Sequence, residues 1–118
     1  MKLKLAPALI LFASLIGAPP SFAVTDCLYK VQKVYVSLDP SGMVYVHLMD
    51  AQGNHKGSIF KNNVMVSEVI LSRFHAQILS AKVSDRTIIV RFPETGADCS
   101  AIVTPARSDI VGVWVQDP

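Results

Sequence analysis

Two cysteines are the residues in this chain with the clearest chemical consequence. Cys27 and Cys99 are the only cysteines in the sequence, and two thiols in an oxidising compartment allow a single intramolecular disulfide. No CxxC pair is present and no histidine lies near either cysteine in sequence, which disfavours a catalytic or metal-binding thiol. We therefore expect a Cys27–Cys99 disulfide, which closes a loop of about 70 residues and stabilises the fold by roughly 4 kcal/mol on the chain-entropy model.

The other residue types capable of chemistry form no pattern typical of an active site. His47, His55 and His75 lack the spacing of metal ligands, and no serine lies in a GxSxG sequence. The carboxylates lie mostly in expected turns and near the chain ends, where solvation or capping explains them. The sequence therefore predicts a protein that is not an enzyme, with no cofactor and no metal.

The first 23 residues have the pattern of a secretory signal peptide. Two lysines precede an apolar run over 5–17, and the small residues Ser21 and Ala23 stand at the −3 and −1 positions of a cleavage site. The run is too short to span a bilayer, although an uncleaved membrane anchor is the alternative interpretation. We expect one domain, 24–118, that is periplasmic or secreted.

The charge of the expected mature chain argues against polyanionic partners. The full chain has 11 Lys plus Arg and 9 Asp plus Glu, and removal of two lysines with the signal segment leaves 9 of each. A neutral domain lacks the electrostatic footprint of a nucleic-acid-binding protein. No later segment approaches 18 consecutive apolar residues, so we expect no stable membrane insertion. The hydrophobic content of 51% argues against disorder.

Alternating apolar residues predict five strands, and a helical pattern with Ser67 as N-cap predicts one helix. The expected strands are 28–38, 43–49, 55–60, 86–92 and 110–116, and the helix is 68–83. The order β-β-β-α-β-β is that of the OB-fold. We predict a mainly β protein with a five-stranded OB-like barrel and a helix between its third and fourth strands. An α+β sandwich of the same order is the alternative.

The predicted helix has two apolar stripes. One stripe is expected to face the core and contains Ile70, Leu71, Phe74, Ile78 and Ala81. A second stripe lies on another side of the helix and contains Val69, Ala76, Leu79 and Val83. A monomer needs only one such stripe, so the second either contacts other copies in a homo-oligomer or is covered by loops at the helix ends.

The strand alternation also separates an inner from an outer set of side chains. The inner set comprises Val34, Val36, Val44, Val46, Leu48 and the valines at 111, 113 and 115. The outer set comprises Tyr35, Tyr45, His47 and Trp114. Outward aromatic rings can pair locally, contact a protein partner or a second subunit, or stack on a glycan. All three interpretations stay open from the sequence.

The layout of the expected mature chain resembles the B subunits of bacterial toxins with five B chains, of the enterotoxin and subtilase type. Cys27 precedes the first strand and Cys99 follows the strand after the helix, as the bridge runs in that family; 67–92 and 109–115 resemble its helix–strand block and closing strand. Related small exported OB-like proteins share this layout. The resemblance implies a non-enzymatic binding or assembly module, glycan- or protein-binding, without identifying sugar-contacting residues. The alternative is a small periplasmic inhibitor or immunity protein.

Overall fold

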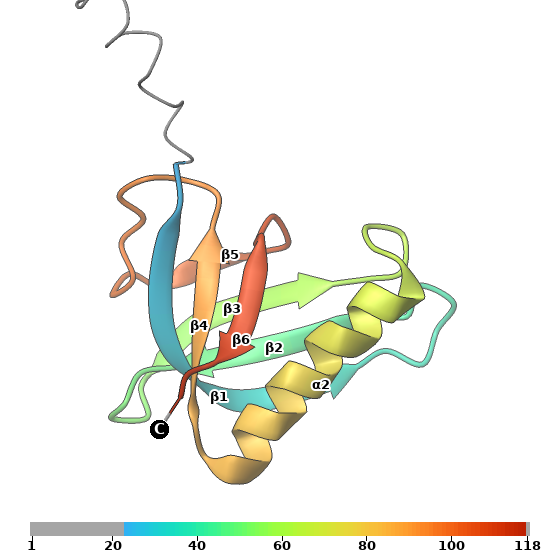
Figure 1. The fold of residues 1–118 in the computed structure, drawn as a ribbon, viewed down its shortest axis with the longest axis horizontal. Coiled ribbons are helices and arrows are strands. Elements are labelled where there is room, and N and C mark those ends of the chain that lie inside the picture. Colours follow the sequence, from blue (N-terminus) through green and yellow to red (C-terminus); the bar gives the residue numbers. More distant parts are fainter. Residues whose placement is uncertain (1–22, 118) are drawn as a thin grey trace, which may run out of the picture.

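The computed structural model describes residues 23–117, so the predicted signal peptide lies, except for its last residue, outside the described residues. The described chain is mainly β, with one helix between its third and fourth strands, as predicted. Figure 1 shows the elements in chain order: β1 (Thr25–Val36), β2 (Val44–Met49), β3 (His55–Lys61), α2 (Glu68–Ser84), β4 (Thr87–Phe92), β5 (Val103–Arg107) and β6 (Gly112–Val115).

The six strands form one sheet in the order β5-β3-β2-β1-β4-β6, and the sheet is not closed. All neighbouring strands are antiparallel except β3 and β5, which pair in parallel. The strands at the two ends of this order, β5 and β6, are consecutive in the chain and are joined by 108–111. The five-stranded prediction thus lacked β5, because Pro105 interrupts its alternation. A proline is tolerated there because β5 lies at an edge of the sheet.

Strand β1 is long and bends, because it pairs with different strands along its length. Its first half, 25–30, pairs with β4, and its second half, 30–36, pairs with β2. The pairing register with β2 shifts between Val31 and Lys33, which marks a bulge that turns the strand and re-aims its side chains. Figure 1 shows β1 curving from the side of β4 and β6 toward β2 and β3.

The ends of the strands explain where the predicted inner set was wrong. Val44, Val46 and Leu48 are buried as predicted, and Val34, Val113 and Val115 pack against the core while partly buried. Val36 is exposed because β1 ends there. Val111 is also exposed, because it precedes the first residue of β6.

Helix α2 covers the core with one side. Ser67 accepts a hydrogen bond from the backbone N–H of Ile70 at its N-terminus, and Asp85 ends it in the left-handed conformation. The predicted core residues Phe74, Ile78 and Ala81 are buried, and Leu71 is partly buried. Ile70 was wrongly assigned to this stripe, since its side chain is 50% exposed. It lies about 100° around the helix from Leu71, at the edge of a groove between α2 and β6.

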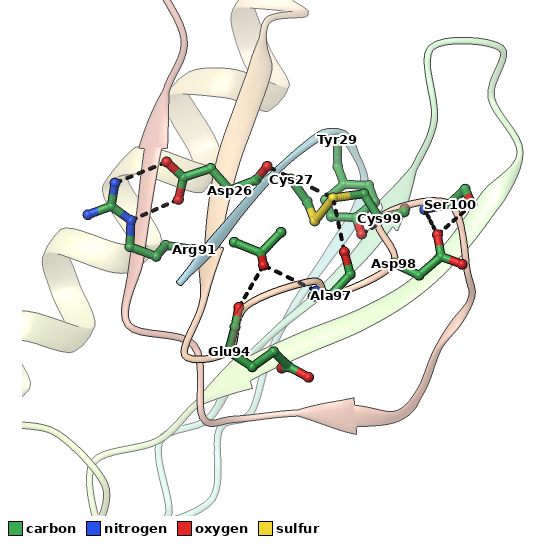
Figure 2. Close-up of a disulfide and its surroundings, with 10 residues drawn as sticks. Asp26, Cys27, Tyr29, Arg91, Glu94, Ala97, Asp98, Cys99 and Ser100 are labelled. Carbon is green, nitrogen blue, oxygen red and sulfur yellow. Dashed lines mark hydrogen bonds and ion pairs between the residues drawn. A yellow bond between two sulfur atoms is a disulfide. The ribbon is translucent and has the colours of Figure 1, made fainter. Parts of the chain in front are cut away.

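The predicted disulfide is present and fastens the loop after β4 to the start of β1. Cys27 is fully buried and its Cα lies 5.3 Å from that of Cys99. Figure 2 shows the hydrogen bonds beside it: the Tyr29 hydroxyl donates to the Cys99 carbonyl (3.0 Å), and the Thr25 hydroxyl donates to the Glu94 carbonyl (2.6 Å). Burial, and secondarily the negative charge of Asp98, raises the pKa of Tyr29, so this hydroxyl stays a proton donor.

Candidate binding surface

A row of aromatic side chains crosses β1, β2 and β3 on the side of the sheet away from the core. Tyr45 stands between the buried residues Val44 and Val46, and alternation therefore directs its ring to the opposite face. Its Cα partners on the neighbouring strands are Tyr35 on β1 and Phe60 on β3. The rings of Tyr45 and Phe60 are nearly parallel, with an interplanar angle of 14° and centroids 5.8 Å apart.

Two histidines extend this row of rings. The His47 ring lies 5.2 Å from that of Tyr45 and 5.7 Å from that of His55, measured between centroids. Nδ1 of His47 is 3.2 Å from the hydroxyl oxygen of Ser58, its Cα partner on β3. We call Tyr35, Tyr45, His47, His55 and Phe60 together the outer aromatic surface.

Polar groups on β1 border the outer aromatic surface. Nδ1 of His55 lies 2.8 Å from the side-chain oxygen of Gln32, and Lys33 is the Cα partner of His47. Gln32 stands at the bulge of β1, which is why neighbouring positions on this strand both reach the same part of the surface. Hydrogen-bonding groups and one positive charge thus adjoin the rings.

The environment of His47 favours its neutral form. Partial burial is the largest cause lowering its pKa, and electrostatic interactions with His55 and Lys33 lower it further. A neutral imidazole has one nitrogen that donates and one that accepts a hydrogen bond. At neutral pH the surface therefore offers both kinds of polar contact beside its rings.

The exposure of these side chains leaves them accessible to a ligand. The Tyr35 side chain is 53% exposed and that of His55 is also exposed, while those of Tyr45, His47 and Phe60 are half-buried. Within 23–117 there is no group of three or more metal-ligating side chains. Half-buried rings with adjacent donors and acceptors suit an uncharged polar ligand that has an apolar face.

Trp114, the fourth residue predicted to face outward, does not join this surface. It lies on β6, at the other end of the sheet from β3, where its Cα partner is Ile89. The Arg91 guanidinium lies over its ring at 5.1 Å from the centroid and also binds the Asp26 carboxylate through two nitrogens, at 2.8 and 3.0 Å (Figure 2). The structure thus brings together Tyr35, Tyr45 and His47 but leaves Trp114 in a local cation–π pair.

The second stripe of α2 is exposed in the single chain. The side chain of Val83 is 86% exposed and that of Val69 is 60% exposed, and Ala76 and Leu79 are exposed between them. Loops therefore do not cover the ends of this stripe within the described residues. Contact with further copies stays a prediction.

Phe60 and His55 belong to the surface although the sequence pattern did not predict them there. Their positions follow from hairpin register: Tyr45 pairs with Phe60 and Val46 with Ile59 across the turn at 50–54. Pairing the predicted strands around that turn would have placed Phe60 beside Tyr45. The contact between His55 and Gln32 had no such signal, because it depends on the bulge in β1.

Among residues 23–117, no helix combines the length and apolarity needed to cross a membrane. Comparison of the chain with models of protein families, with curated proteins and with solved structures finds no match.

Proposed function

We propose that this protein is an exported, non-enzymatic binding module that recognises a carbohydrate through the outer aromatic surface. The observation that carries the proposal is the cross-strand row of Tyr35, Tyr45 and Phe60, continued by the ring of His47. Aromatic faces pack on the apolar face of a sugar ring. Imidazole and amide groups beside them can bond its hydroxyls.

The mixture of rings and polar groups favours a sugar over a protein partner. The centre of a protein–protein interface is depleted of charged residues and packs mainly apolar and aromatic side chains. Here Lys33 and the paired groups of His55 and Gln32 lie directly beside the rings. Such interleaved donors and acceptors fix the orientation of a small polar ligand.

We also propose that the sheet is a five-stranded OB-like barrel. We take β5 and β6 as two halves of one interrupted final strand. Only 108–111 separate them in the chain, and β5 lies at one edge of the sheet while β6 lies at the other. Joined in this way, the strands follow the five-stranded OB-like order, with α2 between the third and fourth strands. OB-folds bind oligosaccharides and oligonucleotides over their second and third strands. The outer aromatic surface draws four of its five rings from β2 and β3, while the absence of net charge in 24–118 disfavours an oligonucleotide.

The disulfide and its position support two further parts of the proposal, namely export and the resemblance to toxin B subunits. The bridge joins the start of β1 to the loop after β4, and disulfides persist in oxidising compartments. Intact mass spectrometry of protein from a secreting host tests export directly. We expect a chain that begins at Val24 and is lighter than the reduced form by two hydrogen atoms. A retained N-terminal segment or free thiols would contradict this part of the proposal.

A glycan array with the oxidised 24–118 protein tests the binding function. We expect binding to one class of sugar, reduced at least about tenfold, or about 1.4 kcal/mol, by Tyr45→Ser. Trp114→Ser is the matched control, because Trp114 is an aromatic residue at the far end of the sheet, and it should retain binding. Circular dichroism and thermal unfolding establish that both variants fold.

Two results would overturn the carbohydrate proposal. One is an array on which the folded wild-type protein binds no sugar. The other is sugar binding that survives Tyr45→Ser and is lost with Trp114→Ser. Inhibition of a periplasmic enzyme or effector that depends on Tyr45 would instead support the inhibitor or immunity alternative.

A further inference from the structure

A groove separate from the outer aromatic surface lies between the first half of α2 and the segment that enters β6. Its volume is about 270 Å³. Phe74 and Ile110 are buried beneath it, whereas Ile70 and Val111 at its edges are 50% and 58% exposed. Val66 and Val113 complete the apolar lining. Exposed apolar side chains on both edges of a concave surface are typical of a site that receives a ligand.

Two positively charged side chains also line this apolar groove. They are Lys61, at the end of β3, and Arg73, on α2. Neither takes part in any ion pair among residues 23–117. The Lys61 ammonium donates one hydrogen bond to the Ser108 carbonyl, at 2.5 Å, and an ammonium has three such donors. Lys61 is thus held at the groove with donors to spare.

The Asp109 carboxylate, which Lys61 influences, already has a different partner. The positive charge of Lys61 contributes to lowering the pKa of Asp109, so the two groups influence each other. However, both oxygens of the Asp109 carboxylate accept hydrogen bonds from the Arg107 guanidinium, at 2.9 and 2.7 Å. The positive charge at the groove is therefore not neutralised by a direct pair with Asp109.

We propose that this groove binds a small amphiphilic monoanion, namely a free medium-chain carboxylate. Its apolar chain would lie between Ile70 and Val111 over Phe74, and its carboxylate would meet Lys61 and Arg73. A volume of about 270 Å³ corresponds to roughly nine water molecules at about 30 Å³ each. The groove thus accommodates a ligand of about that many non-hydrogen atoms, close to the size of octanoate.

The same charges disfavour a second copy of the chain as the occupant. In a two-fold dimer through this groove, the same patch of each subunit would face its counterpart. Lys61 and Arg73 of one subunit would then approach the same two cations of the other. Like charges brought together in this way repel, and the repulsion grows as the interface excludes water.

Titration of the 24–118 protein with octanoate, followed by amide NMR, tests the proposal. We expect saturable shifts concentrated at Ile70 and at 110–113, with weaker binding of the neutral octanol. The double variant Lys61→Gln, Arg73→Gln should weaken octanoate binding at least about tenfold, or about 1.4 kcal/mol, and leave octanol binding unchanged. Arg86→Gln is the charge control, since Arg86 lies beyond the end of α2 and outside the groove lining.

Two substitutions of apolar residues test where the alkyl chain of the ligand lies. Ile70→Ser should weaken the binding of both octanoate and octanol. Leu79→Ser changes an exposed apolar residue of α2 outside the groove and should weaken the binding of neither. Equal affinity for octanoate and octanol, unaffected by the charge variants, would overturn carboxylate recognition. The absence of saturable shifts would overturn the site, as would a dimer in native mass spectrometry that disappears with Ile70→Ser. Sugar binding is measured separately, so failure here is distinguishable from failure of the proposed function.

Discussion

Opening the Cys27–Cys99 disulfide should remove a large part of the stability of this domain. The bridge links residues 72 positions apart, so it restricts the unfolded chain strongly. The chain-entropy relation for a loop of this length gives about 4.4 kcal/mol at 25 °C. Small domains unfold with only about 5–15 kcal/mol in total. We therefore expect the reduced protein to be marginally stable yet folded under native conditions.

The structure indicates that the effect acts mainly on the unfolded state. Without the covalent bond, the Tyr29 hydroxyl can still bond the Cys99 carbonyl, and Thr25 can still bond the carbonyl of Glu94 and the N–H of Ala97. Pairing of β1 with β4 also persists, because it uses backbone hydrogen bonds. The native loop thus keeps its anchors, while the unfolded chain gains conformational freedom.

Urea unfolding of the oxidised and the reduced protein measures this difference. With a slope of about 2 kcal/mol per molar urea, the midpoint should fall by roughly 2 M on reduction. The reduced wild type is preferable to Cys27→Ala, because Cys27 is fully buried and alanine would also remove its packing. A Cys27→Ala, Cys99→Ala variant treated with the same reductant controls for effects of the reagent. A loss below about 1 kcal/mol, with the reduced protein folded, would refute the loop-entropy reasoning.

Three further predictions follow from the core, the sheet edge and the candidate surface. Phe74→Ala should destabilise the protein by about 3–5 kcal/mol in urea unfolding, and Phe74→Leu by clearly less, because leucine leaves a smaller cavity; equal losses would contradict its burial. Gly57→Ala should cost more than about 2 kcal/mol, because φ is +103° and a Cβ would lie 2.4–2.6 Å from atoms of β5. Gly53→Ala, with φ +86° and open space around it, should show only the smaller cost of strain, so matching losses would argue against the close β3–β5 contact. His47 should titrate in NMR below the ordinary pKa of about 6.5, and His55→Gln should raise its pKa. Because the folded-state pKa is lowered, the contribution of His47 to stability is constant above the unfolded pKa and declines as pH falls through the folded pKa. A measured pKa above the ordinary value would contradict the partial burial described for His47.

Local patterns in the sequence were sufficient to predict the elements in which one regular pattern runs from end to end. Strand β2 alternates strictly between buried and half-buried residues, and α2 begins at the predicted Ser67 cap. The disulfide was predictable because two cysteines permit one pairing. In each of these cases the signal lies in neighbouring residues or in a simple count.

The errors occurred where distant parts of the chain decide the structure. The contact between His55 and Gln32 was missed because it depends on the bulge near Val31, and a period-2 pattern contains no sign of a bulge. Strand β5 forms around Pro105 because an edge of β3 is free to accept it. Trp114 alternates as predicted, but the order of strands places it far from Tyr45.

The position of Cys99 also has a consequence for the order of folding. Parallel pairing of Gly57 with Val103 joins residues 46 positions apart, and closing such a loop is slow. Once β1, β2 and β3 have paired and the disulfide has formed, Val103 is only four residues from Cys99, which is then fixed to β1. On loop-closure scaling this shortening lowers the entropic barrier to docking β5 by about 2 kcal/mol. We therefore expect oxidation of the thiols to accelerate completion of the sheet, so that an oxidant in the folding compartment acts on the rate as well as on the final stability.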